Sequence, residues 1–100
     1  MAKENVSTGF EILMKETGAV GPAFGQLVGS LAKESVLDEK THDLAYISVL
    51  TALKCYSGLP FHIAEAMQHG ASLEEVKCAM LISMPLIGLQ VKDALTYLPK

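Results

Sequence analysis

The chain has 100 residues, half of them hydrophobic, and its net charge is −3, because eight lysines face eleven acidic residues and arginine is absent. Arginine is the side chain that most often binds phosphates. Its absence, together with the negative net charge, argues against nucleic acid as a partner. No apolar run approaches the roughly 18 residues that a membrane span needs, and residues 1–5 are too polar for a signal peptide. We therefore expect a cytoplasmic protein with no membrane partner.

A chain of this length builds one hydrophobic core, so residues 1–100 are expected to form a single domain. Its apolar fraction of 50% is high for a small domain, and we expect part of that surface to be buried between subunits of a homo-oligomer. A monomer with an apolar surface is the alternative. The two cysteines, Cys55 and Cys78, fit neither a disulfide scaffold nor a zinc site, so we expect no metal and no cofactor.

Helix signals begin near the N-terminus. Thr8 and Glu11 have the spacing of a capping box, which predicts the start of a first helix, and Gly18 predicts its end. Pro22 suits the first position of a second helix, which should run to about Glu34 because its apolar residues recur at helical spacing.

The third helix is expected from Asp38, a good N-cap, to about Lys54. Its apolar residues go almost all the way round, which is typical of a helix that is central or lies in an interface. A fourth helix is predicted over about 60–70, a fifth after the capping box at 72–75, and a last one over about 89–98. No stretch alternates with period two, so the sequence predicts an all-α array of about six helices.

The chemistry is expected around Cys55 and His62. The thiol precedes a predicted helix, whose N-terminus carries partial positive charge and lowers a thiol pKa, and Lys54 acts in the same direction. His62 could accept the thiol proton or act alone as a general acid–base. The spacing alone also fits an inert core cysteine and a structural histidine.

Three stretches together resemble the carboxymuconolactone decarboxylase / alkylhydroperoxidase D-like family: residues 37–44, Cys55 and residues 61–76. Members typically show an acidic residue near the start of a long helix, a cysteine pair spaced CxxC, a histidine, a small residue, a glycine, and a capped helix with paired glutamates. Those places are held here by Asp43, Cys55, His62, Ala66, Gly70, Glu74 and Glu75. The resemblance covers about two-thirds of the chain, and it implies a small helical enzyme that assembles into trimers or hexamers.

The chain departs from both branches of that family. Gly58 replaces the second cysteine of the CxxC, so the local disulfide of the hydroperoxidase branch cannot form, and the sequence gives no reason to expect Cys78 nearby. The decarboxylase branch resembles this chain around Phe61 and His62, but its polycarboxylated lactone substrate calls for arginine, which is absent here.

Our leading hypothesis is a small-molecule enzyme with thiol-dependent, peroxidase-like chemistry. Cys55 would be the nucleophile, His62 the base or orienting group and Asp43 a supporting residue, with a thiol reductant as a further partner. A decarboxylase-type lyase that uses His62 without thiol turnover is the first alternative. A scaffold or binding protein that keeps the fold without the chemistry is the second.

The position of Asp43 limits its expected role. It lies twelve residues before Cys55, which is about 18 Å along one helix. If the fourth helix folds back antiparallel, His62 should lie nearer residues 48–51 than Asp43, so Asp43 would reach it only across a subunit boundary or would merely support the helix start. His69 is expected to face solvent, and Cys78 to be protected in the middle of a helix.

Overall fold

The computed structural model describes residues 6–99, and over that range the chain is all-α, as its sequence predicts. The elements are α1 (Thr8–Glu16), α2 (Val20–Glu34), α3 (Glu39–Ala52), η2 (Tyr56–Gly58), α4 (Leu59–Gln68), α5 (Leu73–Leu81), α6 (Met84–Ile87) and η3 (Leu89–Tyr97). Within residues 6–99, none of the helices combines the length and the apolar character that a bilayer crossing requires.

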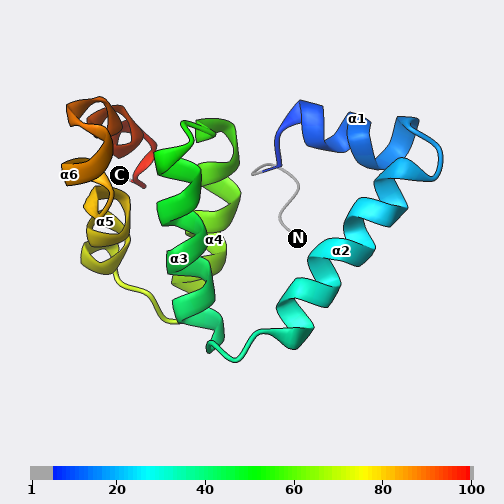
Figure 1. The fold of residues 1–100 in the computed structure, drawn as a ribbon, viewed down its shortest axis with the longest axis horizontal. Coiled ribbons are helices and arrows are strands. Elements are labelled where there is room, and N and C mark those ends of the chain that lie inside the picture. The colour runs from blue at the N-terminus through cyan, green and yellow to red at the C-terminus, as the bar shows by residue number, and fades with distance from the viewer. Residues whose placement is uncertain (1–5, 100) are drawn as a thin grey trace.

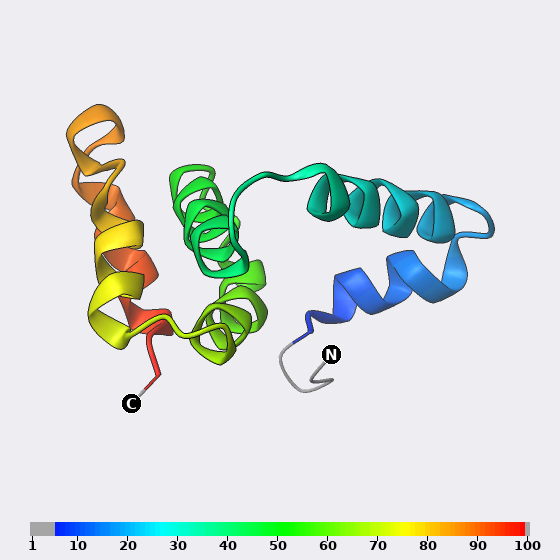
Figure 2. The same ribbon diagram turned by 90° about the horizontal axis from the view of Figure 1, so that it is seen from below.

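The elements form a body and an arm. The body comprises residues 39–97, in which α3 packs against both α4 and α5, and η3 packs against α5 and α6. The arm is the α1–α2 hairpin, which extends to one side of α3, α4 and α5 in both views (Figures 1 and 2). A cavity lies between the arm and the body.

The core lies within the body. Its buried hydrophobic residues come from α3, α4, α5, η3 and the turn between α4 and α5: Ile47, Leu59, Ile63, Ala66, Ala71, Val76, Ala79, Met80 and Ala94. The apolar residues around almost all sides of the third helix predict a central position, and the structure confirms it. Helix α3 supplies Ile47 to this core and packs between α4 and α5. The hydroxyl of Thr51, also fully buried, donates to the Ile47 carbonyl at 2.8 Å, so this polar group is satisfied.

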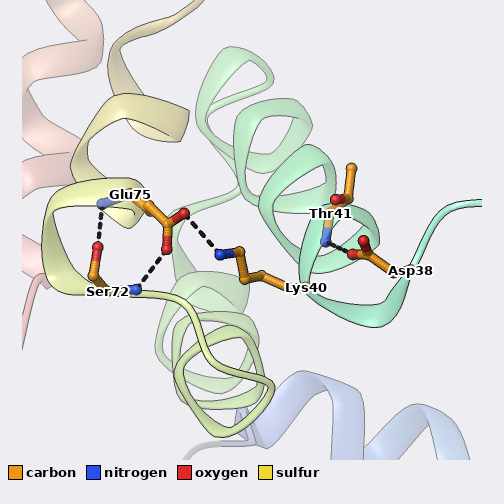
Figure 3. A network of polar contacts seen from close by, with 5 residues as sticks. All are labelled: Asp38, Lys40, Thr41, Ser72 and Glu75. Carbon is orange, nitrogen blue, oxygen red and sulfur yellow. Dashed lines mark hydrogen bonds and ion pairs between the residues drawn. The ribbon is translucent and has the colours of Figure 1, made fainter.

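Two of the predicted helix caps are confirmed, and an ion pair beside them joins α3 to α5 (Figure 3). An oxygen of Asp38 accepts from the Thr41 N–H at 2.7 Å, while Ser72 and Glu75 form the reciprocal bonds of a capping box. The Lys40 Nζ lies 2.8 Å from the Glu75 carboxylate. That lysine and the Ser72 N–H both favour the charged carboxylate, so the pKa of Glu75 is lowered.

Other predicted helix ends need correction in the N-terminal half of the chain. The N-cap of α1 is Ser7, whose side chain accepts from the Phe10 N–H at 3.2 Å, and the helix begins at Thr8. The second helix begins at Val20, so Pro22 is its third residue rather than its first. The helix accommodates a proline there because backbone N–H groups in the first turn lack helical partners. The predicted stop at Gly18 is confirmed, since its φ is +61°.

Two corrections concern the body. Helix α3 ends at Ala52 because the backbone at Lys54 adopts a left-handed φ of +59°, so the helix does not reach that residue. The last element, η3, is a 3₁₀-helix over nine residues. Its buried residues Val91 and Ala94 are three positions apart, which matches three residues per turn and keeps them on one face toward the body.

A glycine sets the close crossing of the arm helices. A Cβ at Gly21 would lie 2.5 Å from the Leu13 carbonyl oxygen and 2.8 Å from the Met14 Cα, so only glycine lets α2 approach the α1 backbone this closely. Residues on the two helices also meet through Phe10 and Phe24, whose rings lie edge to face with centroids 6.2 Å apart. The hairpin therefore presents Phe10 and Phe24 together toward the body.

Candidate functional site

His62 lies in an aromatic environment on α4. Its imidazole stacks on the Tyr46 ring of α3, with centroids 4.3 Å apart and planes 16° apart, and it meets the Phe61 ring edge-on at 5.1 Å. Within residues 6–99 no hydrogen bond to the imidazole is found, in contrast to a structural histidine tied to a backbone carbonyl. Its two ring nitrogens are thus available to a ligand.

The pKa of His62 is lowered, and burial is the main cause because desolvation disfavours the charged imidazolium. The charges of Asp43 and Glu65 act in the opposite direction without reversing the shift. The imidazole is therefore mainly neutral at pH 7, which is the form that can accept a proton.

The His62 pocket, a cavity of about 220 Å³, lies between the arm and the body. Its walls include Phe10 and Phe24 from the arm, Tyr46 and Leu50 from α3, and Phe61 and His62 from α4. Ser57 and Gly58 complete the side nearest the start of α4. The described lining is uncharged and mostly apolar, with four aromatic rings and one histidine, which suits a small ligand.

Gly58 occupies the place of the missing second cysteine, and it faces His62. A Cβ built on Gly58 would lie 3.9 Å from the His62 Cδ2 and 3.4 Å from a Leu50 methyl group. The position where relatives in the hydroperoxidase branch carry a thiol is thus part of the His62 pocket, and glycine leaves it open.

Cys55 lies elsewhere. It is exposed, it immediately precedes η2, and its Sγ is 3.9 Å from the Leu53 carbonyl oxygen. It is not among the residues that line the His62 pocket. The Nζ of Lys54 bonds the Gln90 side chain, so this ammonium is directed toward η3. The structure therefore does not bring Cys55 and His62 into one pocket.

Asp43 pairs with His69. Its Oδ2 lies 2.6 Å from the His69 Nδ1, while the other ring nitrogen faces Glu39 at 3.5 Å. The bond to Asp43 is the main reason that the pKa of His69 is raised, and the charge of Glu39 adds to it. The side chain of His69 is 30% exposed, so it faces solvent in part, as expected, and it also pairs with Asp43 because α4 runs antiparallel to α3 and brings its C-terminal end beside that residue. Asp43 acts on His62 only through its charge.

Cys78 is exposed, so the expectation that it is protected is wrong. Helix α5 directs Val76, Ala79 and Met80 into the core, which leaves Cys78 on another face. It lines an open groove of about 450 Å³ between α3 and α5, together with Leu44 and Ile82.

Tyr46 is the site residue that sequence reasoning missed. It sits four positions before Leu50 on α3, so both reach the face that α4 covers, but that face becomes evident only when the register of α3 against α4 is known. Among residues 6–99, no three His, Cys, Asp or Glu side chains are grouped so that they could hold a metal ion.

Comparison with known proteins defines the family. The model of the carboxymuconolactone decarboxylase family matches residues 19–98, so the chain belongs to that family. Searches among curated proteins and solved structures gave no match. The matched stretch contains Tyr46, Cys55, Gly58 and His62, whereas α1, with its pocket residue Phe10, lies before it.

Proposed function

We propose that the protein is a small-molecule enzyme in which His62 acts as a general acid–base in the His62 pocket. One observation carries the proposal: a neutral imidazole, stacked on Tyr46 and without a hydrogen bond to any of residues 6–99, lines a partly open cavity between the arm and the body. Such a group can take a proton from a substrate and return it at another atom. Among the activities of this family, this favours lyase chemistry at His62.

The proposed substrate carries little charge. None of the described residues that line the His62 pocket is a lysine, and the chain has no arginine, so residues 6–99 offer a polycarboxylate no counter-charge there. In a decarboxylation at this site, the carbon–carbon bond to the carboxylate breaks, carbon dioxide leaves, and the electron pair stays on the substrate carbon. Neutral His62 first takes the proton of the substrate's carboxylic acid group, and the imidazolium then returns that proton to the carbon, which restores the neutral imidazole.

Thiol chemistry at Cys55 is the second candidate, and the exposure of its sulfur favours it. The thiolate would attack the outer oxygen of a hydroperoxide, so that the O–O bond breaks, an alcohol leaves and the sulfur becomes a sulfenic acid. Because Gly58 supplies no resolving thiol, an external thiol would have to condense with the sulfenic acid and release water. A second external thiol would then restore Cys55 by disulfide exchange.

We also propose that the chain works as a homo-oligomer, a trimer or hexamer as its family resemblance implies, in the cytoplasm, where free thiols persist. Helix α2 supports the assembly: Val20, Leu27 and Leu31 lie on one face and are 60%, 55% and 59% exposed. A row of exposed apolar side chains along one helix is a typical subunit contact.

The test is a comparison of His62→Gln with Cys55→Ser. Each variant is assayed for carbon dioxide release from a panel of singly charged keto acids and lactone acids, and for reduction of alkyl hydroperoxides with a dithiol. The proposal predicts that His62→Gln loses about 10² to 10⁴-fold in lyase turnover and that Cys55→Ser keeps it. Hydroperoxide reduction that depends on Cys55 would favour the thiol candidate, and turnover of neither class would favour a binding protein.

A further inference from the structure

The arm carries a second cavity that shares part of its lining with the His62 pocket. This arm groove, of about 590 Å³, is lined chiefly by Phe10, Met14, Phe24, Gly25, Val28 and Gly29. Four residues belong to both cavities: Val6, Phe10, Phe24 and Val28. The edge-to-face pair of Phe10 and Phe24 therefore stands between the two cavities and contributes to both.

The groove is open because two glycines form part of its wall on α2. A Cβ at Gly29 would meet nothing within 4 Å, and one at Gly25 would touch only the Met14 methyl group at 3.4 Å. Two charged residues of α1 also line the groove: Glu11, which is half-buried, and Lys15, which is exposed. The other described residues of the lining are apolar, so most of the groove suits hydrocarbon.

The shape and chemistry of the two cavities together indicate a class of substrate. We propose that the substrate of His62 is an amphiphile with one reactive polar end in the His62 pocket and an unbranched apolar tail in the arm groove. The inference rests on the proposed function, because it takes His62 as the reacting end. It adds a tail site formed by α2 together with α1, and α1 lies before the stretch matched by the family model.

The groove also sets the length of tail that it can hold. Along α2, Phe24 and Gly29 are five residues apart, which corresponds to a rise of about 7.5 Å. Each methylene buried in such a groove should tighten binding about fourfold, until the chain extends beyond Gly29 into solvent.

The experiment uses 1-butanol, 1-hexanol, 1-octanol and 1-decanol as uncharged probes, with binding measured by NMR on the full chain. In the parent, affinity should rise about fourfold per methylene from butanol to octanol. Gly29→Leu, whose Cβ would meet nothing within 4 Å, places an isobutyl side chain at the groove wall, and it should weaken octanol binding at least tenfold and leave butanol unchanged. Ser30→Leu is the matched control, since it adds the same side chain to the same helix at an exposed position outside the groove.

Three outcomes would overturn the inference: affinity that does not depend on chain length, equal effects of Gly29→Leu and Ser30→Leu, or a groove filled by a second copy of the chain. The last would show as absent alkanol binding together with a loss of oligomer in Gly29→Leu, measured by sedimentation. The result is independent of the proposed chemistry, because His62→Gln should still show the chain-length dependence. Loss of turnover in His62→Gln tests the proposed function, and loss of octanol binding in Gly29→Leu tests the tail site, so the two can fail independently.

Discussion

The arm forms one wall of the His62 pocket, so the crossing of α1 and α2 determines the position of that wall. The pair Gly21→Ala and Gly29→Ala tests this crossing. These variants place the same methyl group on the same helix, two turns apart. At Gly21 the new Cβ would lie 2.5 Å from the Leu13 carbonyl oxygen and 2.8 Å from a backbone carbon of Met14, so α1 and α2 must move apart. At Gly29 the Cβ would meet nothing within 4 Å.

The two substitutions should therefore change stability in opposite directions. Overpacking against backbone costs about 1 to 3 kcal/mol, so Gly21→Ala should lower the free energy of unfolding and open the pocket wall formed by Phe10 and Phe24. Gly29→Ala should raise that free energy by about 0.5 to 1 kcal/mol, because alanine replaces glycine inside a helix. Urea unfolding followed by circular dichroism measures both values. Equal stability of the two variants would refute the close α1–α2 crossing.

Three further predictions follow from the site and from the surface. Gly58→Cys should place a thiol beside His62 and raise the rate of hydroperoxide reduction, whereas a rate equal to the parent's would contradict this placement. Because the pKa of His69 is raised in the folded protein, its pairing with Asp43 stabilises the fold at pH values below about 6.5, the pKa of histidine in an unfolded chain. This stabilisation is lost as the pH rises through the higher pKa of His69 in the folded protein. Asp43→Asn should flatten that part of the melting temperature–pH curve; an unchanged curve would rule out the pair. Leu27→Asp should convert the parent oligomer to a monomer near 10.7 kDa in sedimentation, and a monomeric parent would refute assembly.

Local signals predicted the fold well. The caps at Asp38 and Ser72 depend on side chains that bond the next turn of their own chain, so the sequence contains the whole interaction. The central position of α3 could be read from its apolar circumference. The 3₁₀ geometry after Gly88 was not predicted, because spacings of three and four residues are hard to separate over a short segment.

The site was only partly predictable. His62 was singled out by its family pattern, and the structure places it in a pocket, but the pairing of Cys55 with His62 assumed that neighbours in sequence share a site. Tyr46 stacks on His62 and His69 bonds Asp43 because α3 and α4 run antiparallel in one particular register. That register is set by core packing over the whole interface, which no local motif encodes.

Cys78 shows the same limit. Its neighbours Val76, Ala79 and Leu81 suggested a buried position, yet the helix turns its sulfur toward the groove between α3 and α5. Apolar neighbours in sequence occupy different faces of a helix, so burial depends on which face meets the core.

The central claim is that His62 is a neutral imidazole available to a ligand in an aromatic pocket. Proton NMR titration of the three histidines tests it most directly, with assignments from His42→Gln, His62→Gln and His69→Gln. We predict that the pKa of His62 lies below the usual value near 6.5 and that its resonances shift when 1-octanol is added, while the pKa of His69 lies above that value. A His62 resonance that titrates at or above the usual value, and does not respond to the alcohol, would contradict the account.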